Sequence, residues 1–221
     1  MLNKIKKRIR NDYRLYFLFK KIIGNSNLIV DNKTDVCIEG FPRCANTFTV
    51  VAFSTVNPKL KVAHHMHTIA QLKGALKYKI PIVIVIRKPN EAIKSYLVRN
   101  NKVSVTEAIE YYESFYSFVL ENKELLIISD FDDSIKCFDK IIQKTNIKYK
   151  KNFNVFSPTK HEVDKVFKII EDISASSDKA SGVLGTARPN IVKEKYKNKI
   201  NLSSFSLDKC NKLYERIVNR D

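Results

Sequence analysis

Two short apolar runs stand out along the chain and predict buried strands. Residues 82–86 are Ile-Val-Ile-Val-Ile, and residues 125–129 are Leu-Leu-Ile-Ile-Ser. Neither run alternates with polar residues, which is typical of strands buried on both faces of a sheet. A third, shorter strand is expected over residues 34–40, which read TDVCIEG.

Segments compatible with helices separate these strands. We expect helices over residues 2–23, 48–56, 68–79, 90–100, 105–120, 132–145, 161–173 and 207–218. Strands that alternate with helices form parallel βαβ units, so the sequence predicts an α/β fold, a three-layer sandwich around a mostly parallel sheet. A basic N-terminal helix within residues 1–30 would precede a single α/β domain over residues 31–221. Residues 174–190 are rich in Ser, Gly and Ala and are expected to be mobile.

Composition limits the classes of protein that fit this pattern. With 44% hydrophobic residues, 13 Phe and 10 Tyr, the chain is not expected to be disordered. No apolar run approaches the roughly 18 residues of a transmembrane helix, and the apolar residues 15–19 are too few for a signal-peptide core. The four cysteines fit no zinc pattern and suggest no disulfide framework, so we expect a cytoplasmic protein. The net charge of +17 indicates an anionic partner: nucleic acid, a membrane surface, an acidic polymer or a phosphorylated small molecule.

The first motif that could bind an anion is GFPRCANTF, residues 40–48, at a strand-to-helix junction. A loop that feeds a helix start presents unpaired backbone N–H groups and the positive end of the helix dipole. Arg43 adds a positive charge and Thr47 a hydroxyl donor. The segment is not a Walker A loop, because it lacks the Gly-Lys-Ser/Thr ending. An ordinary strand-to-helix turn with a surface arginine is the alternative interpretation.

The second motif follows the strand at 82–86. Arg87 comes at its carboxyl end, Pro89 can begin a helix, and Ser95 lies about two turns into that helix. An arginine with a nearby hydroxyl suits a second phosphate. Taken alone, this motif would favour the alternative interpretation, a solvated charge and a helix-surface serine.

Together the two motifs resemble the sulfotransferase family that uses 3′-phosphoadenosine 5′-phosphosulfate (PAPS). In that family a loop like Pro42–Thr47 binds the 5′-phosphosulfate, and an Arg and a Ser spaced like Arg87 and Ser95 bind the 3′-phosphate. The resemblance implies a P-loop-NTPase-like fold and a metal-free reaction in which PAPS yields PAP (3′-phosphoadenosine 5′-phosphate). Cys44 and Ala45 replace the family's usual Ser and Gly. The donor-binding residues implied are Arg43, Cys44, Ala45, Asn46, Thr47, Phe48, Arg87, Ser95 and, from a late loop, Arg188, with Lys193 and Lys195 as the next candidates.

The resemblance also implies a catalytic histidine, acting with Arg43, and we expect it to be His65. The family's histidine precedes the arginine of the second motif by about 22 residues, which is the separation of His65 and Arg87. In an extended segment His64 would face the other side of the sheet, whereas His67 would share the side of His65. Glu39 is the next candidate for the base. No Asp, Glu or Cys within a few residues completes a metal site with these histidines.

The sequence therefore predicts a sulfotransferase that moves a sulfuryl group from PAPS to a hydroxyl or amine of an acceptor such as a carbohydrate. One rival is a nucleotide-dependent kinase on a related fold, although the P-loop lysine is missing. Another is a non-enzymatic nucleic-acid-binding module, although most aromatic residues fall in apolar helices rather than among the basic residues. The basic residues 1–23 also suit peripheral contact with a membrane surface.

Overall fold

The computed structural model describes residues 12–22, 28–176 and 191–219. Within these residues the fold is α/β, with a four-stranded, all-parallel sheet in the order β2-β1-β3-β4. The strands are β1 (Val36–Gly40), β2 (Val62–His64), β3 (Ile82–Ile86) and β4 (Ile127–Asp130). Every residue of β1 and β3 is buried, as expected for central strands covered on both faces.

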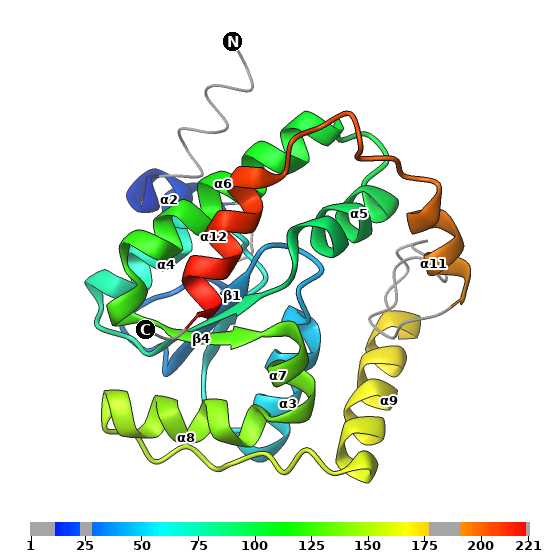
Figure 1. Cartoon of the computed structure of the whole chain (residues 1–221). Helices are drawn as coiled ribbons and strands as arrows, with labels where there is room; N and C mark the ends of the chain where they lie inside the picture. Colours follow the sequence, from blue (N-terminus) through cyan, green and yellow to red (C-terminus); the bar gives the residue numbers. More distant parts are fainter. Residues whose placement is uncertain (1–11, 23–27, 177–190, 220–221) are drawn as a thin grey trace.

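Helices cover both faces of this sheet (Figure 1). On one face lie α2 (Tyr13–Ile22), α4 (Ile69–Lys77), α6 (Val105–Glu121) and α12 (Asp208–Val218). On the other lie α3 (Asn46–Val56), α7 (Phe131–Lys136) and α8 (Phe138–Tyr149). Beyond the carboxyl ends of the strands lie α5 (Pro89–Arg99), α9 (Lys160–Ser176) and α11 (Ile191–Asn198).

Two expectations about the elements were wrong in detail. The helix expected over 132–145 is two helices, because Cys137 adopts a non-helical backbone (φ −137°) that ends α7 and lets α8 begin at the buried Phe138. The strand expected from Leu125 begins at Ile127, since a 3-10 turn, η2 (Lys123–Leu125), leaves Leu125 exposed. Helix α11 was not expected. Of the basic helix expected over 2–23, the described part is α2.

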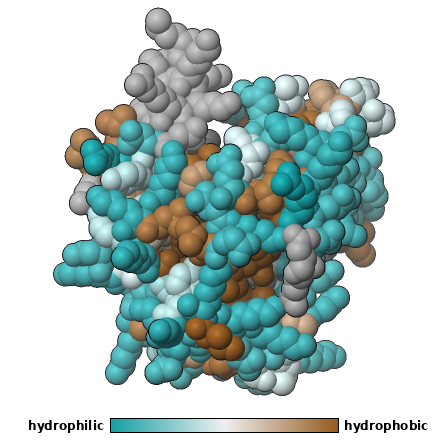
Figure 2. Space-filling model, turned by 60° about the vertical axis from the view of Figure 1, so that its left-hand side comes forward, coloured by the Kyte–Doolittle hydropathy of each residue, from teal (hydrophilic) through white to brown (hydrophobic). Residues whose placement is uncertain are grey.

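The surface is mostly polar and charged, with hydrophobic areas between (Figure 2). No helix among the described residues is long and apolar enough to cross a membrane.

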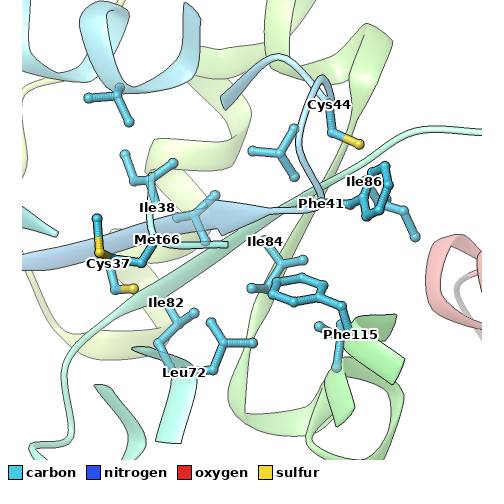
Figure 3. Packing of buried hydrophobic residues seen from close by; sticks show 14 of the residues in the cluster. Cys37, Ile38, Phe41, Cys44, Met66, Leu72, Ile82, Ile84, Ile86 and Phe115 are labelled. Carbon is cyan, nitrogen blue, oxygen red and sulfur yellow. The ribbon is translucent and has the colours of Figure 1, made fainter. Parts of the chain in front are cut away.

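The sheet supplies the centre of the core (Figure 3), where Ile38, Ile82 and Ile84 pack against side chains from both helical layers. Helix α2 joins this core through α4: a Cβ at Gly74 would lie 2.5 Å from the Phe17 ring, so only glycine lets the two helices approach this closely. At the carboxyl end of β1 the backbones of β1 and β3 also lie close together, since a Cβ at Gly40 would lie 2.2 Å from the carbonyl oxygen of Val85. The loop after β1 therefore starts directly against β3.

Candidate anion-binding site at the carboxyl edge of the sheet

The strand order places the two sequence motifs at a point where the chain changes direction across the sheet. From β1 the chain moves to β2 on one side, and it then crosses back to β3 and β4 on the other. The loops after β1 and β3 thus leave neighbouring strands at the same edge, where Gly40 pairs with Val85. Parallel α/β sheets bind ligands at such switch points.

The loop after β1 is held in a strained conformation that exposes the start of α3. Arg43 (φ 71°) and Ala45 (φ 70°) both adopt the left-handed region that favours glycine. Ala45 also stands at the N-cap of α3 and makes no side-chain capping bond. The first-turn amides of α3 have no partner within the helix, so they can donate to a ligand. Strain of this kind is often found at functional sites.

Three of the predicted donor-binding residues turn inward rather than toward a ligand. Asn46 donates from Nδ2 to the carbonyl of Phe41 (2.9 Å), and this bond stabilises the loop. The Cys44 side chain is fully buried, where burial raises the pKa of its thiol to about 12, and Phe48 is buried in the core. Cys44, Asn46 and Phe48 can therefore contact a ligand only through backbone groups.

The two motifs, far apart in sequence, meet at Arg43. Its Nε donates to Oγ of Ser95 in α5 (3.3 Å). Arg87 donates from Nη1 to the carbonyl of Arg43 (3.4 Å), and its guanidinium lies 4.2 Å from the centre of the Phe131 ring. Arg43, Arg87 and Ser95 thus form one cluster.

Positive charge accumulates around this cluster. Burial, followed by the charges of Arg99 and Arg87, lowers the pKa of Arg43 to about 10. Lys193 of α11 is only 7% exposed, and burial together with Arg43 and Arg99 lowers its pKa to about 8. These positive groups repel one another and have lost part of their hydration. A bound anion would reduce both costs, so the cluster favours binding of an anion.

Glu91, an acidic residue beside the cluster, is already engaged by basic side chains. Glu91 accepts from Arg87 (3.2 Å) and from the buried Lys197 (2.9 Å), and Lys197 lowers the pKa of Glu91. This network joins α11 to α5 beside the site.

The sequence analysis did not anticipate Arg99 in this site, and it named Lys193 only as a secondary candidate for donor binding. A signal for Arg99 was present, because it follows Ser95 by four residues and so shares its helix face. Lys193 depends on the docking of α11, for which the local sequence offers no signal. Arg188, the first choice from the late loop, lies outside the described residues, as does most of the segment expected to be mobile.

The histidines lie at the carboxyl end of β2, on the other side of β1 from β3 and Arg87. They form a turn rather than an extended segment. His64 ends β2, but His65 (φ 57°) and His67 (φ 51°) are left-handed, so the expected alternation of side chains is wrong. His64 and His65 face each other through their Nδ1 atoms instead of pointing apart. His65 Nε2 lies 3.0 Å from Oγ1 of Thr47, in the first turn of α3.

The two left-handed histidines differ in their surroundings. Burial, with smaller contributions from the neighbouring histidines and Arg99, lowers the pKa of His65 to about 3, so its ring is neutral at physiological pH. His67 lies with Nδ1 2.7 Å from the carbonyl oxygen of Gly40. Because a carbonyl can only accept, Nδ1 of His67 carries a proton and donates it to Gly40.

Glu39 holds the histidine turn in place. Its side chain is fully buried at the end of β1, and its two carboxylate oxygens accept from the backbone amides of Met66 (2.8 Å) and His67 (2.9 Å). Burial raises the pKa of Glu39 to about 8, although these amides oppose the shift. Glu39 thus lies beneath the turn, where it positions the histidines.

Within the described residues, no group of three or more His, Cys, Asp and Glu side chains has an arrangement that could hold a metal ion. Comparison of the chain with models of protein families and with curated proteins gives no match. The assignment of a function therefore rests on the geometry of this site.

Proposed function

We propose that the chain is a sulfotransferase with a P-loop-like donor site, which transfers a sulfuryl group from PAPS to a hydroxyl or amine of an acceptor. The observation that carries the proposal is the contact between Arg43 and Ser95. This contact joins the loop after β1 to α5, the helix after β3. The loop and the helix segment each contribute residues that suit one anionic group of the donor.

The proposed binding mode assigns one group of PAPS to each part of the cluster. Arg87 and Ser95 hold the 3′-phosphate, while Arg43, Thr47 and the first-turn amides of α3 hold the phosphosulfate. Lys193 adds a positive charge beside them. This surplus of positive charge suits a ligand that carries two separate anionic groups.

In the proposed reaction the acceptor oxygen or nitrogen forms a bond to sulfur as the bond from sulfur to the bridging phosphate oxygen breaks. The leaving phosphate keeps that bond's electron pair, and a protein base takes the acceptor proton. Arg43 and the loop amides stabilise the charge that develops on the leaving group, as preorganised donors do in other group transfers.

We assign the base to the histidine turn, with His65 as the first choice. Its contact with Thr47 places it beside the loop that would hold the sulfate. His67 is the alternative, because it lies in the same turn and its Nδ1 contact with the Gly40 carbonyl fixes the orientation of its ring beside the loop. A positioned base contributes about 10²–10⁴-fold to a rate. His65→Ala should therefore lose turnover on that scale while keeping its affinity for PAP; the same result for His67→Ala alone would transfer the role to His67.

Titration of the pure protein with PAP, ATP–magnesium and RNA separates the three classes of function. The proposal predicts that PAP binds without magnesium and more tightly than the other two. Preference for ATP–magnesium would favour the kinase, and preference for RNA the nucleic-acid-binding module. Either preference would overturn the proposal.

The acceptor is tested separately, with radiolabelled PAPS and panels of carbohydrates, lipids and peptides. Transfer of label to any panel, lost in His65→Ala or His67→Ala, supports the reaction. Tight PAP binding with no transfer to any class of acceptor would contradict the proposed transferase.

A further inference from the structure

Helix α2 has an inner apolar face that fixes it to the domain. Phe17 packs over Gly74 of α4, and the Tyr16 hydroxyl donates to Sδ of Met66 (3.3 Å). Both aromatic side chains are buried. The helix is therefore a docked part of the fold, with a defined outer side.

The outer side of α2 is also apolar, which is unusual for a surface helix. Leu15, Leu18, Phe19 and Ile22 are 48%, 60%, 48% and 75% exposed. Their spacing of three, four and seven residues places them on one face of the helix. We call these four residues the outer stripe. A surface helix normally presents polar residues here, so the stripe needs a partner to cover it.

The surroundings of the outer stripe are basic. Neither α2 nor α4, which packs against it, contains an acidic residue, and Asp12, just before α2, accepts from the first-turn amides of Arg14 and Leu15. Arg14 is exposed on α2 four residues before Leu18, and Lys77 is exposed on α4 with its Nζ 5.2 Å from the centre of the Tyr13 ring. In the sequence before α2, residues 1–10 add five Lys or Arg and no acidic residue. Figure 2 shows hydrophobic areas bordered by hydrophilic ones on this side of the molecule.

We propose that α2 docks on the surface of an anionic lipid bilayer, with the outer stripe inserted among the acyl chains near the headgroups. Apolar side chains bordered by Lys and Arg fit a surface that is apolar inside and negatively charged outside. Charge argues against a second copy of the chain as the partner, since pairing the stripe with itself would bring two basic surfaces together. The helix lies along the bilayer surface and does not cross it.

Docking would also orient the candidate site. Tyr16, on the inner face of α2, contacts Met66 in the histidine turn, and the amide of Met66 donates to Glu39. One side chain thus links the docked helix to the turn that holds His65 and His67. The lipid proposal does not depend on the sulfotransferase assignment.

The test is co-sedimentation of the full chain with vesicles of phosphatidylcholine, with or without about one third phosphatidylglycerol. The wild type should bind the anionic vesicles and should bind neutral ones at least about 10-fold more weakly. The double variant Leu18→Ser/Phe19→Ser should lose at least about 10-fold in affinity for anionic vesicles, because two inserted side chains are removed. The matched control is Leu125→Ser/Ile147→Ser, which removes two side chains that are 55% and 80% exposed outside α2.

Circular dichroism and thermal denaturation establish that each variant is folded, which is expected because all four substituted side chains are exposed. Control binding equal to the wild type supports the proposal. Absence of wild-type binding to anionic vesicles would overturn it, as would equal binding by Leu18→Ser/Phe19→Ser. Sedimentation velocity tests whether a second copy of the chain covers the outer stripe instead. If the wild type is a dimer that does not bind vesicles, and Leu18→Ser/Phe19→Ser is a monomer, the partner is another chain and not the lipid.

Discussion

Replacement of Glu39 by Gln should change how the stability of the protein depends on pH. Glu39 is fully buried, and its pKa is raised from 4.5 to about 8. Below pH 4.5 the carboxyl is protonated in both the folded and the unfolded chain. Between pH 4.5 and 8 the unfolded chain releases the proton and the folded chain keeps it, so rising pH favours unfolding.

The magnitude follows from that pKa change. One pKa unit corresponds to about 1.4 kcal/mol. The titration of Glu39 should therefore lower the unfolding free energy of the wild type by up to about 5 kcal/mol between pH 4.5 and pH 8. Gln has the same shape and no charge at any pH. It cannot accept at both amides of Met66 and His67, which costs about 1–3 kcal/mol throughout. Glu39→Gln should thus be less stable than the wild type at pH 5 and more stable than the wild type near pH 8.

The assay is urea denaturation of both proteins from pH 5 to pH 8.5, followed by circular dichroism. Glu121→Gln, at an exposed position in α6, controls for the loss of one acidic residue. The unfolding free energy of the wild type minus that of Glu39→Gln should fall steadily as the pH rises and should change from positive to negative. A difference that stays constant over this range would refute the buried, protonated state of Glu39.

Three further substitutions test other parts of the site. Arg87→Ala should weaken PAP binding about 10–100-fold more than binding of adenosine 5′-phosphosulfate, which lacks the 3′-phosphate; equal losses by calorimetry would remove Arg87 from that role. In the wild type, PAP affinity should fall above pH 8 as Lys193 loses its proton, and Lys193→Met should bind more weakly and without that fall; a parallel pH profile would exclude Lys193. Ala45→Gly should raise the unfolding free energy by about 1 kcal/mol, a few degrees in thermal denaturation, because glycine adopts φ 70° without strain; unchanged or lower stability would contradict the strained loop.

The sequence was most informative where structure is decided locally. Ile82–Ile86 is β-branched throughout, and it is a central parallel strand as expected. The closeness of Arg43 to Ser95 could be inferred because both motifs follow strands, and parallel strands end at a common edge. Arg99 could have been added from helical spacing alone.

Features that depend on distant contacts could not be foreseen. The histidines leave the extended conformation because Glu39, 26 residues before His65, accepts the amides of the turn. Lys193 approaches Arg43 only because α11 packs beside α5, with Lys197 bonded to Glu91. No local pattern encodes either arrangement.

The central claim is that Arg43 is the focus of a site for the PAPS nucleotide, and calorimetric titration with PAP tests it most directly. The wild type should bind, and Arg43→Ala should lose at least about 30-fold in affinity, as expected when one partner of a buried charged contact is removed. Arg216→Ala, which removes an exposed arginine of α12, should bind like the wild type. Failure of the wild type to bind PAP, or equal affinity in Arg43→Ala, would contradict the account.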